Sequence, residues 1–221
     1  MTTLAFDVYG TLIDTNGVLV LLEKIVGEKA KAFSQTWRDK QLEYSFRRGH
    51  MQNYVDFEVC TLQALEYCCL FYKIKLSDEE KKELMAIYAV LPSFDDVKDS
   101  LTELKEKGFR LFAFSNGKAA AVEKLLTNAG IRDLFLGVVS VDDIKTFKPS
   151  PAAYAHFLRS AEVKGEEAWL ISSNPFDVTG SISAGMKSAW IQRSAEAIFD
   201  PWEIQPMITV TSLLELAKKL D

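Results

Sequence analysis

The sequence predicts an α/β protein: a doubly wound, mostly parallel sheet with an all-helical cap inserted into it. Three observations predict this fold. A short apolar segment at residues 3–8 is typical of a buried strand, and beyond Pro92 strand-like and helix-like segments alternate. Between them, residues 16–90 show no strand-like alternation and are rich in Glu, Lys, Leu, Ala and aromatic residues, as amphipathic helices are.

The first strand is expected to end at Tyr9-Gly10-Thr11, where glycine favours a turn. In the helical block that follows, Phe33, Trp37 and Gln41 recur at the spacing of one helical stripe. The block is therefore expected to contain several helices that each present one side to a core.

Capping signals mark where individual helices begin. Asn53 is expected to cap a helix that runs to about residue 72, and Ser77-Asp78-Glu79-Glu80 fits a capping box that opens another. Ser150 and Pro151 fit the cap and first position of a later helix.

The alternating part is expected to have helices at about 95–107, 119–129, 151–163 and 177–186, and from residue 211 or 212 onward. Its strands are expected at 110–114, 138–141, 168–171, 188–191 and 208–210. Because the helical block interrupts this pattern after the first strand, residues 1–15 and 91–221 are predicted to form the core domain and residues 16–90 the cap domain.

Composition and charge exclude several classes of function. The formal net charge is -5, and no cluster of Lys and Arg with interleaved aromatics is present, so no nucleic-acid partner is expected. The apolar run at residues 18–22 is far too short to span a bilayer, and the first residues show no signal-peptide pattern. A cytoplasmic protein with no membrane partner is predicted.

The three cysteines, Cys60, Cys68 and Cys69, lack the CxxC spacing of a metal site and are expected to be small core residues. Only two histidines are present, which argues against a His-based metal site or a Ser-His-Asp triad. Catalysis is therefore expected to proceed without His.

Polar side chains gather where the predicted strands end. In an open parallel sheet, ligands bind outside the carboxyl ends of the strands, so these side chains are expected to converge on one site. They are Asp7 after the first strand, Ser115 and Asn116 after the second, Lys148 in a loop, and Ser172, Asn174 and Asp177 after a later strand.

These clusters resemble the four motifs of the haloacid dehalogenase superfamily, in which the first Asp is a covalent nucleophile. The resemblance spans nearly the whole chain and implies a Rossmann-like core with Asp7 as the nucleophile. The four segments are Asp7-Val8-Tyr9-Gly10-Thr11-Leu12, Ser115-Asn116-Gly117, Lys148-Pro149-Ser150-Pro151 and Ser172-Ser173-Asn174-Pro175-Phe176-Asp177.

Tyr9 separates this chain from the phosphatases of that superfamily, which carry a second Asp two residues after the nucleophile. That Asp protonates the leaving oxygen of a phosphate ester, whereas a halide leaves without a proton. Tyr9 is a poor replacement, since the reference pKa of tyrosine is about 10. Asn174 stands where an acid is expected for Mg²⁺, which leaves Asp177 alone, so no metal and no cofactor are predicted.

The cap segment Trp37-Arg38-Asp39-Lys40-Gln41-Leu42-Glu43-Tyr44 resembles the arginine-bearing helix of L-2-haloacid dehalogenases. That family hydrolyses a 2-haloacid through an aspartyl ester, with inversion at C2, and its Arg helps to bind the halide. The resemblance therefore implies that Asp7 displaces the halide from a short L-2-haloacid, that Arg38 receives it, and that a D-2-hydroxyacid is released. Arg38 suits this role because it stays charged and offers five donors.

The resemblance implies roles for further residues. Thr11 and Ser172 hold Asp7, and Lys148 keeps it ionised. Asp177 holds Lys148 and Asn174 in place, and these three together orient the hydrolytic water. Ser115 binds the substrate carboxylate, and Asn116 helps Arg38 to bind the halide. Tyr154 faces the site, and Val8 contacts the substrate. An apolar wall is expected from Tyr9, Leu42, Phe57 and Phe176.

The family is commonly homodimeric, so a homodimer is predicted, and the aromatic-rich helix at residues 54–72 is either its interface or part of the cap's own core. Two other functions remain open at this point: an Mg²⁺-dependent small-molecule phosphatase of the same superfamily, and a non-enzymatic binding protein on this fold. Tyr9 argues against the first, and the intact set of Asp7, Ser115, Lys148 and Asp177 argues against the second.

Overall fold

The computed structural model describes residues 1–220 and contains one six-stranded sheet in which every neighbouring pair of strands is parallel. This confirms the predicted α/β class. The sheet order is β3-β2-β1-β4-β5-β6, so the first strand of the chain lies in the middle. The strands are β1 (Thr3–Phe6), β2 (Arg110–Ser115), β3 (Gly137–Ser140), β4 (Ala168–Ser172), β5 (Lys187–Ile191) and β6 (Ile208–Val210).

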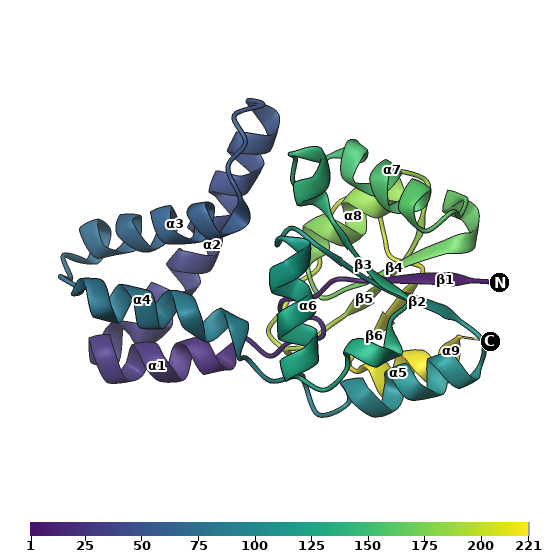
Figure 1. Ribbon diagram of the computed structural model, residues 1–221, viewed down its shortest axis with the longest axis horizontal. Helices are drawn as coiled ribbons and strands as arrows, with labels where there is room; N and C mark the ends of the chain where they lie inside the picture. The colour runs from purple at the N-terminus through teal and green to yellow at the C-terminus, as the bar shows by residue number, and fades with distance from the viewer. Residues whose placement is uncertain (221) are drawn as a thin grey trace.

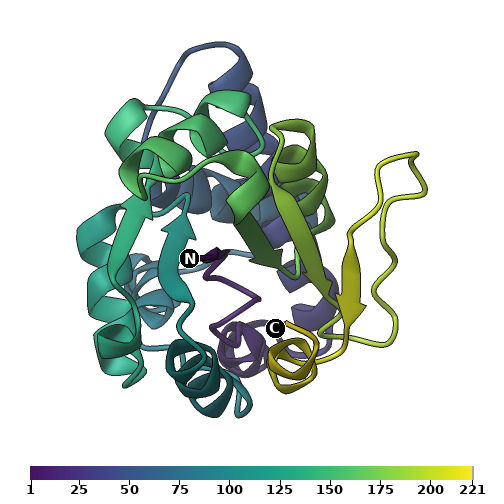
Figure 2. The same ribbon diagram turned by 90° about the vertical axis from the view of Figure 1, so that its right-hand side faces the viewer.

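Helices cover both faces of the sheet (Figures 1 and 2). Because side chains alternate along a strand, Leu4 and Phe6 pack in one apolar cluster with α5, α6 and α9, while Ala5 packs in another with α7. These helices are α5 (Val97–Glu106), α6 (Ala119–Asn128), α7 (Pro151–Ser160), α8 (Pro175–Ser183) and α9 (Leu213–Lys219).

Residues 16–90 form helices only, as predicted, and these lie beyond the carboxyl ends of the strands in Figure 1. The division into domains at residues 15/16 and 90/91 stays a prediction. Among the described residues, no helix has both the length and the apolar character that crossing a membrane requires. The helices are α1 (Asn16–Val26), α2 (Ala30–His50), α3 (Phe57–Tyr72) and α4 (Asp78–Ala86).

The capping predictions are partly confirmed. Ser77 and Glu80 form the expected reciprocal capping box at the start of α4. The prediction for Asn53 is wrong: α3 begins three residues later, where Asp56 has an extended backbone and its Oδ1 accepts a hydrogen bond from the Val59 N–H at 2.9 Å. Pro151 begins α7 as expected, but the Ser150 side chain makes no capping hydrogen bond.

Several other boundaries differ from prediction by one to three residues, and two of these lie beside the polar strand ends. β1 ends at Phe6 because the chain turns after it, and the Val8 carbonyl accepts hydrogen bonds from the N–H groups of Leu12 and Ile13. This turn leaves Asp7 just beyond the strand. α8 begins at Pro175, two residues early, because proline fits the first turn of a helix. The three cysteines are unpaired and buried, as predicted.

Candidate active site

The site lies at the carboxyl ends of the three central strands. Asp7 directly follows β1, Ser115 is the last residue of β2, and Ser172 is the last residue of β4. The chain places β2 on one side of β1 and β4 on the other, which is the point of a parallel sheet where ligands characteristically bind. The strand ends point toward α1–α4 (Figure 1).

Asp7 is almost fully buried, and both of its carboxylate oxygens accept hydrogen bonds. Its Oδ2 accepts from Thr11 Oγ1 at 2.9 Å and from Asn174 Nδ2 at 2.8 Å, with Ser172 Oγ at 3.4 Å. Its Oδ1 accepts from Lys148 Nζ at 2.9 Å. Because donors surround it, the carboxylate is held in one orientation.

Lys148 lies between two carboxylates. Its Nζ donates to Asp177 Oδ2 at 2.6 Å, to Asp7 Oδ1 at 2.9 Å and to the Phe114 carbonyl at 3.2 Å, so all three ammonium protons have an acceptor. The side chain is 2% exposed. Burial lowers the pKa of Lys148, but the charges of Asp177 and Asp7 outweigh that effect and raise the pKa above its usual value.

Asp177 is fully buried at the start of α8. Burial raises its pKa to about 6, although the Lys148 ammonium lowers it and the Asp7 charge adds to the rise. The hydroxyl of Tyr154 donates to Asp177 Oδ1 at 2.9 Å. Tyr154 therefore acts on the site through Asp177 and does not reach the cavity itself.

Arg38 reaches the site from α2. Its Nη2 donates to Asn174 Oδ1 at 3.3 Å, and its Nη1 donates to Gln41 Oε1 at 2.6 Å. Burial lowers the pKa of Arg38, and nearby Tyr88 and Asp7 partly offset that effect. Asp39, its neighbour in sequence, is exposed and accepts a hydrogen bond from Gln35 Nε2, so its charge points away from the cavity.

A small cavity of about 20 Å³ lies among these groups. Six of its lining residues are charged or polar and four are apolar or aromatic. All ten lining residues are among those predicted for the site: Asp7, Tyr9, Arg38, Leu42, Phe57, Ser115, Asn116, Lys148, Asn174 and Phe176.

Ser115 and Asn116 are held by backbone groups. Ser115 Oγ accepts from the Gly117 N–H at 3.1 Å, and Asn116 Oδ1 accepts from the Lys148 N–H at 2.9 Å. With these acceptor atoms engaged, the hydroxyl proton of Ser115 and the NH₂ group of Asn116 are the parts left to meet a ligand. Both are donors, which suits anionic ligands.

Tyr9 lines the cavity as an aromatic surface. Its ring packs edge-on against Tyr88 with centroids 6.0 Å apart, and burial raises the pKa of its hydroxyl to about 12. Phe176 packs edge-on against Phe46 at 5.0 Å. These contacts fix the aromatic part of the cavity wall.

Among the residues predicted to bind substrate, Val8 has its side chain elsewhere. Its side chain is fully buried in the main apolar cluster and is not part of the cavity lining. The backbone amide of Val8 lies next to Asp7, and substrate binding through this amide stays a prediction.

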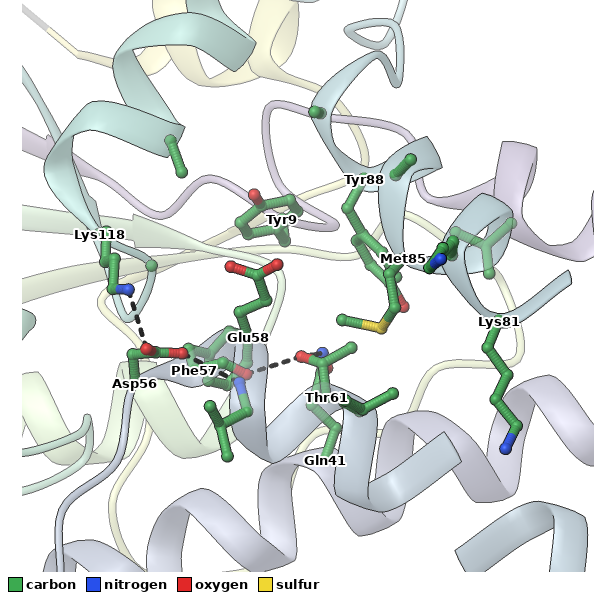
Figure 3. A pocket seen from close by; sticks show the side chains of 18 of the residues that line it. Tyr9, Gln41, Asp56, Phe57, Glu58, Thr61, Lys81, Met85, Tyr88 and Lys118 are labelled. Atoms are coloured by element: carbon green, nitrogen blue, oxygen red, sulfur yellow. Dashed lines mark hydrogen bonds and ion pairs between the residues drawn. The ribbon is translucent and has the colours of Figure 1, made fainter. Parts of the chain in front are cut away.

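A much larger cleft of about 840 Å³ adjoins the small cavity (Figure 3). Tyr9, Arg38 and Phe57 line both, so they form the boundary between the cleft and the small cavity. The cleft lies between α3, α4 and the start of α6, and its lining includes Glu58 and Lys118. Its volume is ample for a small solute, and the three shared residues place it next to the small cavity.

Several residues around the site carried no functional signal in the sequence. Gln41 shared a stripe with core residues, and Ser173, whose N–H donates to Thr11 Oγ1 at 2.8 Å, lay inside a motif without an assigned role. Arg193 donates through Nε and Nη2 to the Thr11 carbonyl and pairs through Nη1 with Asp96 at 2.8 Å. No spacing rule connects Arg193 to the first motif, because the contact is made between distant parts of the chain.

The sequence matches the haloacid dehalogenase-like hydrolase family over residues 1–185. It is 32% identical to an (S)-2-haloacid dehalogenase of Pseudomonas sp. (strain YL), over 97% of this chain and 94% of that protein. It is 36% identical to haloacetate dehalogenase H-2 of Moraxella sp. (strain B), over 94% and 92%. The structure of the L-2-haloacid dehalogenase from Xanthobacter autotrophicus with chloropropionic acid covalently bound aligns with a TM-score of 0.91 at 28% identity, covering 99% of this chain and 97% of that one.

Proposed function

This chain belongs to the haloacid dehalogenase-like hydrolases, among (S)-2-haloacid dehalogenase relatives, and we propose that it hydrolyses short L-2-haloalkanoic acids to D-2-hydroxyalkanoic acids. The setting of Asp7 is the observation that carries this proposal. A buried carboxylate is held by Lys148 at 2.9 Å beside a small cavity that Arg38 also lines. A nucleophile and a cationic receiver for a leaving anion thus share one cavity.

In the first step, one carboxylate oxygen of Asp7 forms a bond to C2 of the substrate while the carbon–halogen bond breaks. The halide leaves with the bonding electrons, on the side opposite Asp7. C2 is inverted, and an ester joins Asp7 to the acid. Ser115, with nearby backbone N–H groups such as that of Val8, binds the substrate carboxylate, while Arg38 and Asn116 receive the halide.

In the second step, water attacks the carbonyl carbon of Asp7. The bond between that carbon and the ester oxygen breaks, the 2-hydroxyacid leaves with that oxygen, and one proton is released to solvent. C2 is untouched, so the inversion of the first step persists in the D-product. Lys148, Asn174 and Asp177 orient the water, and Thr11 and Ser172 keep the Asp7 carboxylate in place.

The cavity suits short substrates. Tyr9, Leu42, Phe57 and Phe176 form an apolar wall that excludes water and strengthens the electrostatic interactions inside. At about 20 Å³ the cavity holds little more than a water molecule, so even a short haloacid requires the lining side chains to move, and a long alkyl chain requires a larger movement.

We propose that this reaction needs no metal. Among residues 1–220, no group of three His, Cys, Asp or Glu side chains is arranged to hold a metal ion. The ammonium of Lys148 stands between Asp7 and Asp177, where a cation would otherwise bridge them. A phosphatase reaction is disfavoured because Tyr9, with a pKa of about 12, is a very weak proton donor for a leaving alkoxide.

The experiment that tests the function is halide release from L- and D-2-chloropropanoate in the presence of EDTA, with chiral analysis of the lactate. We expect chloride release from the L-substrate only, with D-lactate as product. No halide release from any of several short 2-haloacids would refute the function. Activity lost with EDTA and restored with Mg²⁺ would refute only the metal-free reaction.

A homodimer is proposed as well. Two neighbouring large apolar residues near the end of α3 face solvent, namely Leu70 at 80% and Phe71 at 60% exposure. A second copy that covers this surface would remove them from water. Light scattering after size exclusion tests this, and a monomer at micromolar concentration would refute it.

A further inference from the structure

Arg38 is one link in a chain of hydrogen bonds that begins at Asp7. Asn174 donates through Nδ2 to Asp7 and accepts through Oδ1 from Arg38 Nη2. Arg38 Nη1 donates in turn to Gln41 Oε1 at 2.6 Å. Gln41 lies nearly one helical turn after Arg38 on α2, so both side chains leave neighbouring positions of one helix.

The chain continues from Gln41 to α3. Gln41 Nε2 donates to Thr61 Oγ1 at 2.6 Å, and Thr61 Oγ1 donates to the Phe57 carbonyl at 2.8 Å (Figure 3). A hydroxyl has only one proton, and that of Thr61 is used for the carbonyl. Thr61 can therefore only accept from Gln41, which turns the amide NH₂ toward Thr61 and the amide carbonyl toward Arg38.

Burial makes a flip of the Gln41 side-chain amide energetically costly. Gln41 is 1% exposed and Thr61 is 4% exposed, so water is poorly placed to replace a lost partner. The Trp37 indole N–H also donates to the Thr61 carbonyl at 2.8 Å, which ties the same turn of α3 to α2. The orientation of the amide is thus set by groups that lie away from the substrate.

We propose that Gln41 is a positioning residue that aims the guanidinium of Arg38 at the departing halide, and that Thr61 sets the direction of the Gln41 amide. A neutral carbonyl fits this task, because it orients Arg38 without neutralising its charge. A carboxylate at this position would pair with Arg38 and weaken its attraction for halide. The inference rests on the proposed dehalogenase function and adds residues that do not touch the substrate.

The test measures the two chemical steps separately, in single-turnover experiments with L-2-chloropropanoate and L-2-bromopropanoate. Chloride is the poorer leaving group and the stronger hydrogen-bond acceptor, so its departure depends more on Arg38. In Gln41→Leu we expect chloride release to slow roughly tenfold or more and bromide release to slow less. Hydrolysis of the Asp7 ester should keep its wild-type rate, because the halide has gone by then.

Thr61 provides a conservative pair of variants. Thr61→Val removes the acceptor for Gln41 and should raise the bromide-to-chloride rate ratio, as Gln41→Leu does. Thr61→Ser keeps the hydroxyl and should restore the wild-type ratio. This pair carries the test if Gln41→Leu does not fold.

Ser45→Ala is the matched control. Ser45 is also buried on α2, about one turn beyond Gln41, and its hydroxyl donates to the Leu42 carbonyl, outside the chain from Asp7 to Thr61. Its rate ratio should equal that of the wild type. An unchanged ratio in both Gln41→Leu and Thr61→Val, or an equal slowing of both chemical steps, would overturn the inference. Absence of halide release from the wild type would instead refute the proposed function.

Discussion

The Nζ of Lys148 lies 2.6 Å from Oδ2 of Asp177, and both side chains are almost completely excluded from solvent. This pair sets the expected pH dependence of catalysis. Above pH 6 the Asp177 carboxylate is ionised and holds the ammonium. As the pH falls through about 6, the pKa of Asp177, the carboxyl takes up a proton and its hold on Lys148 weakens.

We therefore expect kcat/KM for halide release to rise with pH, with a midpoint near 6. A pH–rate profile of the wild type, measured with a saturation series at each pH, checks this. In Asp177→Asn the fall in kcat/KM below pH 6 should disappear, because Asn does not titrate, and most of the activity should be lost at every pH. An acid limb centred near pH 4, where an ordinary aspartate titrates, would contradict the prediction.

The free energy of unfolding has the opposite pH dependence for this group. The pKa of Asp177 is higher in the folded protein than its ordinary 3.8. Its contribution therefore favours the folded state below about pH 4 and is lost as the pH rises through about 6. Comparing urea denaturation of the wild type and Asp177→Asn at pH 5 and pH 8 isolates this contribution, and the wild type should gain relative stability at the lower pH.

Asp7→Asn is expected to lower halide release by roughly a thousandfold or more, since an amide is a far weaker nucleophile than a carboxylate. Circular dichroism should show an unchanged fold, because Asn has nearly the same shape. Wild-type single turnover in ¹⁸O-labelled water gives a positive readout: the label should enter Asp7 and be absent from the first product. Label found in the first product would mean that water attacks C2 directly.

Phe176→Ala is expected to shift the substrate preference toward longer chains. Its ring lines the small cavity, so truncation provides room for an alkyl group. The ratio of kcat/KM for 2-bromobutanoate over bromoacetate should rise several-fold. Phe199→Ala is a suitable control, because Phe199 packs on Trp190 with ring centroids 5.2 Å apart and is not part of the cavity lining. If this ratio is equal in Phe176→Ala and Phe199→Ala, Phe176 does not control the preferred chain length.

Arg193→Met is expected to destabilise the fold by about 3 kcal/mol, because it leaves the largely buried Asp96 carboxylate without its cation. The substitution should also lower activity. Arg193 holds the backbone carbonyl of Thr11, and the hydroxyl of Thr11 donates a hydrogen bond to Asp7. Arg132→Met provides the contrast. Arg132 pairs with Glu123 at a more exposed place, where the expected loss is below about 1 kcal/mol. Equal losses in urea denaturation would contradict this difference.

Local patterns in the sequence predicted the parallel sheet and the polar residues at its strand ends. Arg38, Leu42 and Phe57 were expected around the site only through the resemblance to the dehalogenases. Strand ends in a parallel sheet share one edge, so Asp7, Ser115 and Ser172 were expected to meet, and they do. The beginning of α3 was misjudged, because both Asn53 and Asp56 are good caps and only the backbone conformation decides between them.

The positions that the sequence did not reveal depend on the direction of hydrogen bonds. Gln41 looks like a core position in the sequence, since it repeats with Phe33 and Trp37. Its link to Arg38 becomes visible only when Thr61, on another helix, is in place. Arg193 is similar, because its bond to Thr11 joins residues that no local pattern connects.

The central place of β1 has a consequence for how the protein is made. β1 pairs with β2, where Thr3 lies beside Arg110, and with β4, where Thr3 lies beside Ala168. A ribosome completes β1 long before either neighbour exists, so the nascent chain carries Asp7 without Lys148 beside it. Such long-range pairing slows folding. Asp7 is synthesised well before Lys148, and its surroundings are complete only once β4 and α8 have followed.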